Sequence, residues 1–162
     1  MRRRVLLLGG GAALAGCGFE LRKAPDFAFR SIAIPANTSM ANELRRTISS
    51  SGDVQVTGRQ LPLDQAQVVL DLVSEQREKV VVGLNASGQV REFQLRSIVR
   101  FRLRTPQGRE LIPETELVQQ RDISFNESAV LAKEAEETLL YRDMQTDLVQ
   151  QLMRRLAALR TV

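Results

Sequence analysis

Few residues of this 162-residue chain could carry out covalent or metal chemistry. The chain has no histidine, and its one cysteine, Cys17, closes an apolar stretch near the start. Without histidine, the chain lacks the usual partner of a serine or threonine nucleophile and the usual ligand set for zinc or copper. The composition therefore predicts no catalytic residue of these classes, no metal site and no cofactor.

The segment that ends at Cys17 has the order of a bacterial export signal. Three arginines at 2–4 precede an apolar run too short to span a bilayer, and Leu14-Ala15-Gly16-Cys17 resembles the lipobox of bacterial lipoproteins. In that motif the cysteine receives fatty acyl chains such as palmitate, and two or three chains give a lasting membrane anchor. Gly18 replaces the aspartate that commonly retains lipoproteins in the inner membrane, so we expect the outer membrane, on its periplasmic side.

We expect residues 1–16 to be a signal peptide, 17–29 a lipid-anchored tether and 30–162 a single domain. Three of the 23 basic residues lie in the signal, which leaves 20 against 19 acidic residues and a formal charge of +1. A uniformly basic surface for nucleic acid is therefore not expected.

Paired carboxylates are the catalytic option that remains, because a glycoside hydrolase needs only an acid and a base or nucleophile. Glu114 with Glu116, or Glu134 with Glu137, are the pairs that could be imagined in these roles. The first pair lies in a predicted strand, and the second lies near the start of a predicted helix, where acids favour the helix dipole. Aromatic residues, which stack on sugars, make up only 4% of the chain. An envelope glycan hydrolase is thus an alternative that no residue favours.

Alternation of apolar and charged residues is the clearest pattern in the chain. It runs over 66–82 and 90–105 and predicts two long strands, each with one buried face, joined by a hairpin loop at 83–88. After a second turn, 110–125 keeps the alternation and predicts another strand, with an edge or bulged start at Pro113.

Two segments have helical spacing, 37–50 and 126–159. A short strand over 30–35 precedes the first helix, and 53–58 is a candidate for another brief strand. The order of elements predicts an α+β fold, with two helices packed on one face of a mainly antiparallel four-stranded sheet. The apolar residues of the long helix that we expect in the core are Leu131, Ala135, Leu139, Met144, Leu148, Leu152, Leu156 and Leu159.

The outer face of the two long strands carries charges of both signs. Pairing that keeps apolar residues opposite one another sets Asp71 opposite Arg100 and Glu75 opposite Arg96. Such cross-strand pairs would contribute about 0.2–1 kcal/mol each and would explain the row of arginines. A dedicated anion-binding stripe is the alternative. The apolar residues that this pairing buries in the first strand are Val68, Leu70, Leu72, Val80 and Val82.

Three segments resemble the lipopolysaccharide-assembly lipoproteins of the LptE family. They are "AGCGFELR" at 15–22, "GQVREFQLRSIVRFRL" at 88–103 and "AVLAKEAEETLLYRDMQTDLVQQLMRRL" at 129–156. The last is the most specific, because it joins a lysine, an acidic cluster, Tyr141-Arg142-Asp143-Met144 and a basic pair in family order. The likeness runs through nearly the whole chain and is weakest over 50–65.

The resemblance implies a non-enzymatic protein of the outer membrane. Family members plug the lumen of the large β-barrel LptD, assist its assembly, and bind lipopolysaccharide on its way to the outer leaflet. A lipoprotein adaptor for another envelope complex is the alternative, because the same anchored domain could dock elsewhere.

The resemblance also implies a ligand-contacting region at "LAKEAEE". There Lys133 would meet lipid A phosphates or core sugar anions as a point charge. The hairpin tip lacks the basic residue that relatives carry, and Lys79 and Arg91, which flank the tip, would substitute for it. The alternatives are a solvated helix lysine and ordinary charges at strand ends.

A plug also needs a polar face toward a polar barrel lumen. The charged outer face of the two long strands would meet that need, and its residues are Asp71, Glu75, Arg96, Arg100 and Arg102.

Overall fold

Three long antiparallel strands form most of the sheet in a computed structural model that describes residues 26–52, 54–57 and 63–162. These strands are β3 (Val68–Leu84), β4 (Val90–Arg104) and β5 (Glu110–Ser124), which follow one another through two tight turns. Each turn contains a glycine in the left-handed region, Gly88 with φ of 80° and Gly108 with φ of 96°. Glycine adopts this conformation at no steric cost, so both predicted turns are confirmed.

Two short strands complete a sheet of five strands in the order β2-β1-β3-β4-β5. β1 (Ser31–Ala33) pairs in parallel with both β3 and β2 (Gln55–Thr57). The prediction of four strands is therefore one strand short, because the brief segment at 53–58 does join the sheet. The sheet is mixed, although its three long strands are antiparallel as predicted.

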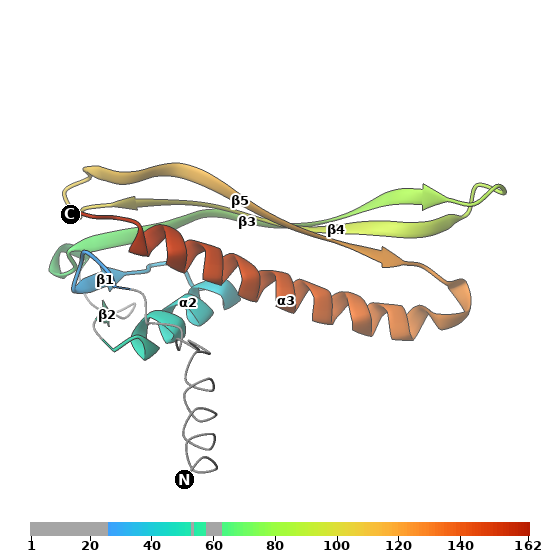
Figure 1. Cartoon of the computed structure of the whole chain (residues 1–162), viewed down its shortest axis with the longest axis horizontal. Coiled ribbons are helices and arrows are strands. Elements are labelled where there is room, and N and C mark those ends of the chain that lie inside the picture. The colour runs from blue at the N-terminus through green and yellow to red at the C-terminus, as the bar shows by residue number, and fades with distance from the viewer. Residues whose placement is uncertain (1–25, 53, 58–62) are drawn as a thin grey trace, which may run out of the picture.

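Both helices lie on one face of this sheet, as predicted (Figure 1). α2 (Ser39–Ser50) begins after Thr38, whose side-chain oxygen accepts a hydrogen bond from the Ala41 backbone N–H at 3.1 Å. This N-cap satisfies one of the free donors of the first turn. α3 (Val130–Ala157) follows a single 3₁₀ turn at Glu127–Ala129, which Asn126 caps in the same way.

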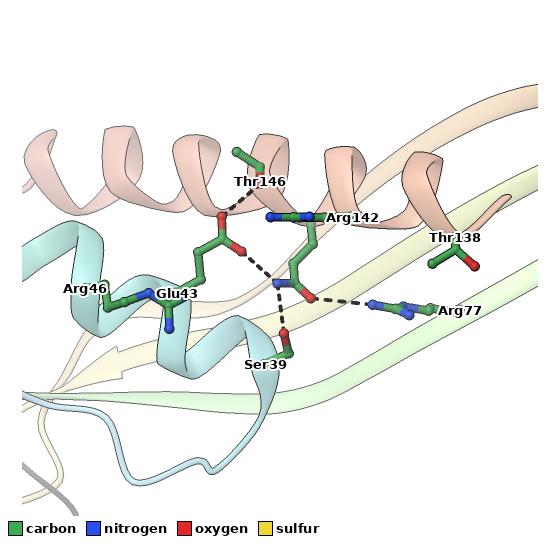
Figure 2. Close-up of a pocket in the computed structure, with 8 residues that line it drawn as sticks. Ser39, Glu43, Arg46, Arg77, Thr138, Arg142 and Thr146 are labelled. Atoms are coloured by element: carbon green, nitrogen blue, oxygen red, sulfur yellow. Dashed lines mark hydrogen bonds between the residues drawn. The ribbon is translucent and has the colours of Figure 1, made fainter. Parts of the chain in front are cut away.

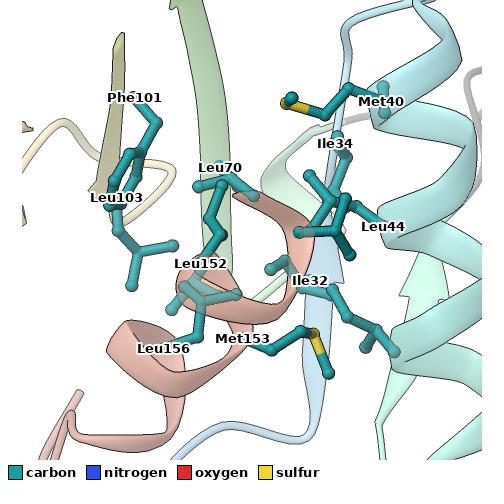
Figure 3. Packing of buried hydrophobic residues seen from close by; sticks show 14 of the residues in the cluster. Ile32, Ile34, Met40, Leu44, Leu70, Phe101, Leu103, Leu152, Met153 and Leu156 are labelled. Atoms are coloured by element: carbon teal, nitrogen blue, oxygen red, sulfur yellow. The ribbon is translucent and has the colours of Figure 1, made fainter. Parts of the chain in front are cut away.

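The main hydrophobic core lies at the end of the molecule where β1, α2 and the second half of α3 meet. Ile32, Leu44 and Leu152, one from each of these elements, are fully buried against Leu70 and Leu103 of the sheet (Figure 3). At the opposite end, which we call the distal end, the β3–β4 hairpin projects past β5 and the start of α3 (Figure 1).

The first half of α3 departs from the predicted packing. Leu131 and Leu139 are 82% and 59% exposed, and Ala135 is exposed between them, so the prediction that they lie in the core is wrong. Here α3 packs on the sheet through Tyr141, Met144 and the partly buried Leu140, and through the ion pair between Lys79 and Glu137. Leu131 and Leu139 face solvent instead. The predicted core residues that are fully buried are Met144, Leu148, Leu152 and Leu156.

The register between β3 and β4 also differs from the prediction. Asp71 lies opposite Arg102, and Glu75 lies opposite Val99, with a β-bulge between Leu72 and Ser74. The bulge adds one residue, Val73, to β3 and so exchanges the two faces of the strand beyond it. Strict alternation cannot be continued through such an insertion, so the predicted pair Glu75–Arg96 is wrong. The predicted pair Asp71–Arg100 lies before the bulge and is wrong because Asp71 pairs two residues further along β4, with Arg102.

The bulge explains which residues of β3 face the helices. Before it, the even-numbered Val68 and Leu70 are buried beneath the helices, as predicted. Beyond it, the even-numbered Val80 and Val82 face the open side and are 40% and 48% exposed, against the prediction. The odd-numbered side chains of β3 turn toward the helices instead, and Lys79 reaches α3.

Candidate functional site

The face of the sheet away from the helices, the open face, carries four arginines at alternate positions of β4. Each is paired with an acid on a neighbouring strand, as cross-strand electrostatics favour. The contacts from guanidinium nitrogen to carboxylate oxygen are Arg96–Glu78 at 4.0 Å, Arg100–Glu116 at 2.9 Å, Arg102–Asp71 at 3.0 Å and Arg104–Asp71 at 2.7 Å. Each arginine of the row thus contacts a carboxylate that the predicted register did not assign to it, and Arg102 and Arg104 share Asp71.

Asp71 is the least exposed member of this network. Burial raises its pKa, but hydrogen bonds and charges from Arg104 and Arg102 outweigh burial, so the pKa of Asp71 lies below its ordinary value. The same hydrogen bond raises the pKa of Arg104. Asp71 and Arg104 therefore stay ionised at neutral pH, and their ion pair joins β3 to β4.

Of the five residues predicted for the outer face, four lie on the open face: Asp71, Arg96, Arg100 and Arg102. Glu75 lies on the helix side. Its carboxylate accepts a hydrogen bond of 2.6 Å from the Thr38 hydroxyl at the start of α2, and its cross-strand neighbour Val99 is fully buried. The placement of Glu75 on the outer face is therefore wrong, because the bulge at Val73 turns it inward.

Three basic residues were predicted to contact the ligand, and two of them lie close together at the distal end. Lys79 from β3 and Lys133 from α3 line one small hollow, the distal pocket, with Phe93, Phe125 and Glu137. The two phenylalanine rings meet edge to face with centroids 5.4 Å apart, and the Lys79 ammonium lies 4.5 Å from the Phe93 centroid. The aromatic pair thus supports the wall on which the cations lie.

Each lysine of the distal pocket already has a carboxylate partner. Lys79 donates to Glu137 at 2.6 Å, and Lys133 donates to Glu136 at 2.8 Å and to the Ser124 hydroxyl at 2.9 Å. Ion pairs at a surface contribute about 0–1 kcal/mol each, so an incoming anion could displace the glutamates at little cost. With about 70 Å³, the pocket holds about two water molecules, so a larger anionic group would bind at its rim.

Arg91 lies beside the distal pocket rather than in it. Its backbone carbonyl accepts a hydrogen bond from the Phe125 N–H at 2.7 Å, and Arg91 and Phe125 line a second hollow of about 300 Å³ with Asn126, Glu127 and Ser128. Phe125 separates the two hollows. The three predicted cations therefore surround one aromatic residue at the distal end.

A larger pocket of about 490 Å³ opens between α2, α3 and β3 (Figure 2). Gln145 lies against it and is only 8% exposed, and its amide nitrogen donates to the Glu43 carboxylate at 2.7 Å and to the Ser39 hydroxyl at 3.2 Å. We call it the interhelix pocket. All eight residues that line it are polar or charged, and they include arginines from each of the three elements.

One member of each carboxylate pair considered for hydrolysis lies in an ion pair with a basic residue. Glu116 binds Arg100, and Glu137 binds Lys79. Within 26–52, 54–57 and 63–162, no group of three or more acids or cysteines could hold a metal ion, and no helix is long and apolar enough to cross a membrane. Cys17, the predicted site of lipidation, lies outside the residues that the structure describes.

Sequence patterns did not point to Phe125 or to the arginines of the interhelix pocket. Arg46 and Arg142 each lie on the polar side of an amphipathic helix, where a solvated charge is the usual interpretation. Strict alternation would place Arg77, at an odd-numbered position of β3, on the outer face with Asp71. Only the bulge, which leaves no clear local signal, turns it toward Tyr141, whose ring centroid lies 5.1 Å from the guanidinium carbon.

The fold and its sites define a class of small α+β domain also found in solved bacterial lipoproteins. An uncharacterized lipoprotein B from Nitrosomonas europaea is 35% identical, with a TM-score of 0.75 over 87% of this chain and 91% of that one. The rare lipoprotein B from Shewanella oneidensis, at 19% identity, shares the fold with a TM-score of 0.66 over 80% of this chain and 95% of that one. A minor lipoprotein from Acinetobacter baumannii, at 21% identity, also shares the fold, with a TM-score of 0.64 over 82% of this chain and 94% of that one.

The chain belongs to the lipopolysaccharide-assembly family LptE, whose family model matches residues 29–156. The match covers both helices and all five strands of the described structure. In a comparison with curated proteins, no sequence matches this chain significantly. The family resemblance inferred from sequence motifs is therefore confirmed.

Proposed function

We propose that this protein is a non-enzymatic lipoprotein of the outer membrane that binds lipopolysaccharide at its distal end and plugs a LptD-like β-barrel. The family match over 29–156 carries the proposal. Acyl chains on Cys17 would hold the domain on the periplasmic side of the membrane, since two or three chains give stable anchoring.

The distal end supplies the chemistry for lipopolysaccharide. Lys79, Lys133 and Arg91 surround Phe125 there, and phosphate groups of the lipid would bind these cations in exchange for glutamate partners. The exposed side chains of the projecting hairpin offer a nearby apolar surface for acyl chains. They include Val80, Val81, Val82 and Leu84.

The open face supplies a surface for the barrel. Arginines and acids alternate across it, as a polar barrel interior requires, and no helix covers it. Arg96 and Arg100 make the more exposed ion pairs of this face, so they could exchange their partners for groups on the barrel wall.

The lipopolysaccharide site is tested with full-length protein that carries Lys79→Gln and Lys133→Gln. Each lost contact to a phosphate at an exposed site is expected to weaken binding about fivefold, so the double variant should bind at least about tenfold more weakly. Arg154→Gln with Arg155→Gln is the matched control, because it removes two exposed charges near the other end of α3.

If lipopolysaccharide binding is weakened equally in the two double variants, net charge alone explains the effect. That result would contradict the assignment of the distal site. Far-ultraviolet circular dichroism of each variant checks that the fold is intact. The barrel face is tested separately by Arg96→Glu with Arg100→Glu. Association with the barrel that is unchanged in this folded variant would show that the open face is not the interface.

A further inference from the structure

The interhelix pocket has a composition that suits an anionic, hydroxyl-rich ligand. Arg46 from α2, Arg77 from β3 and Arg142 from α3 all line it (Figure 2). The remaining lining is neutral and polar apart from Glu43, and it contains no apolar side chain. The pocket therefore offers nothing to an acyl chain or another apolar ligand.

The three arginines of the pocket make no ion pair with a carboxylate among the residues that the structure describes. The arginines of the open face, by contrast, each contact a carboxylate. Arg77 makes a weak contact of 3.5 Å with the Gln145 amide oxygen and lies over the Tyr141 ring, which leaves other guanidinium donors available. Three arginines against one glutamate leave the lining with a formal charge of +2 (three minus one), which favours an anion.

Glu43 offsets only one of the three arginine charges. Its two carboxylate oxygens accept hydrogen bonds from the Thr146 hydroxyl at 2.9 Å and from the Gln145 amide at 2.7 Å. These bonds hold the carboxylate between α2 and α3 (Figure 2). The pocket therefore keeps an excess of positive charge.

Neutral groups on the same walls can bind hydroxyls. Ser39, Thr138 and Thr146 contribute hydroxyl groups, and Gln145 contributes an amide. A cavity of about 490 Å³ lies within the range of sites that enclose small molecules and has room for one or two sugar rings. α2 also begins at this wall, so the positive end of its dipole favours an anion there.

We propose that the interhelix pocket binds an anionic sugar, meaning a sugar unit that carries a phosphate or a carboxylate. The guanidinium groups bind the anion, and the hydroxyl and amide groups bind the sugar hydroxyls. This inference does not rest on the proposed function, because the pocket shares no lining residue with the distal pocket. The sugar could be free or could belong to a glycolipid.

The test is calorimetric titration of the full chain in mild detergent with glucose 6-phosphate, glucose and inorganic phosphate. Glucose 6-phosphate should bind more tightly than either of the other two, and its affinity should fall as salt is added. Arg46→Gln with Arg142→Gln should weaken binding at least about tenfold, because two charge-assisted contacts are lost. The affinity of Arg142→Lys for glucose 6-phosphate should lie between those of the unmodified chain and the double variant, since lysine keeps the charge but cannot make a bidentate contact.

Arg154→Gln with Arg155→Gln, which removes the same charge outside the pocket, should bind glucose 6-phosphate as the unmodified chain does. Displacement of glucose 6-phosphate by lipopolysaccharide would show that the sugar belongs to a glycolipid. Failure to displace it would point to a free sugar phosphate. Glucose that binds as well as its phosphate, or inorganic phosphate that binds as well as the sugar phosphate, would overturn the proposal. So would the absence of detectable glucose 6-phosphate binding in the folded, unmodified chain.

Discussion

Replacement of Asp71 by asparagine should destabilise the domain at neutral pH, and this destabilisation should disappear in acid. Asp71 accepts hydrogen bonds from Arg104 Nε at 2.7 Å and from Arg102 Nε at 3.0 Å, and its side chain is 18% exposed. Hydrogen bonds to charged groups contribute about 1.5–3 kcal/mol, and exposed ion pairs contribute about 0–1 kcal/mol. Because Arg102 is half exposed and asparagine keeps one acceptor, we expect a loss of about 1–2 kcal/mol in the free energy of unfolding.

The pH dependence follows from the lowered pKa of Asp71. A carboxyl group whose pKa is lower in the folded state contributes its full stabilisation above the unfolded pKa, about 3.9, and loses it as the pH falls through the folded pKa. The difference between the unmodified chain and Asp71→Asn should therefore stay constant from pH 7 to about pH 5 and shrink toward zero below about pH 4.

Urea denaturation followed by circular dichroism measures both effects. Glu116→Gln is the control, because the Glu116–Arg100 pair on the same face is about half exposed and should contribute at most about 0.5 kcal/mol. A cost of Asp71→Asn that does not change with pH would refute the electrostatic account. An equal cost for Glu116→Gln would refute the role of burial.

Two further predictions concern α3. Leu152→Ala, at a fully buried position, should cost about 2–5 kcal/mol in urea denaturation, whereas Leu139→Ala, at an exposed one, should stay within about 0.5 kcal/mol; similar costs would contradict the described packing. Tyr141→Phe removes a hydrogen bond of 2.8 Å to the Glu78 backbone carbonyl and should cost about 1 kcal/mol at pH 7. Burial and then the charge of Glu137 raise the pKa of Tyr141, so this cost should shrink as the pH rises above about 10; a cost that grows there would contradict the sign.

Much of the fold could be predicted because local signals agree with it. The helix at Ser39–Ser50 has its capping residue, Thr38, and an apolar stripe at fourfold spacing that matches the buried face. The two glycine turns and the long alternating strands could be predicted equally well, since each depends only on residues that are neighbours in the sequence.

The register could not be predicted for two reasons. It shifts at Val73 and again beyond Val81, and alternation cannot distinguish registers that differ by two residues, as at Asp71. Three consecutive valines from Val80 to Val82 carry no alternation that could reveal the change. The first half of α3 failed for a related reason. Leu131 and Leu139 have core-like spacing, but the helix packs on the sheet through Leu140, Tyr141 and Met144 instead.

The candidate sites depend on contacts that sequence spacing does not show. The prediction of Lys79 as a ligand contact rests on its position near the hairpin tip, and that of Lys133 rests on a family motif. The fold brings both residues to one pocket. The interhelix pocket needs residues from α2, β3 and α3, and one of them, Arg77, is positioned by the bulge. Long-range packing thus decides what the charged residues can do.

The most direct test of the central claim is purification of the tagged full chain from its native envelope in mild detergent, with mass spectrometry of the proteins that come with it. The account predicts a large β-barrel protein in near one-to-one amount and acyl chains on Cys17. A different partner, or none, would contradict the role as a barrel plug and would favour an adaptor of another envelope complex.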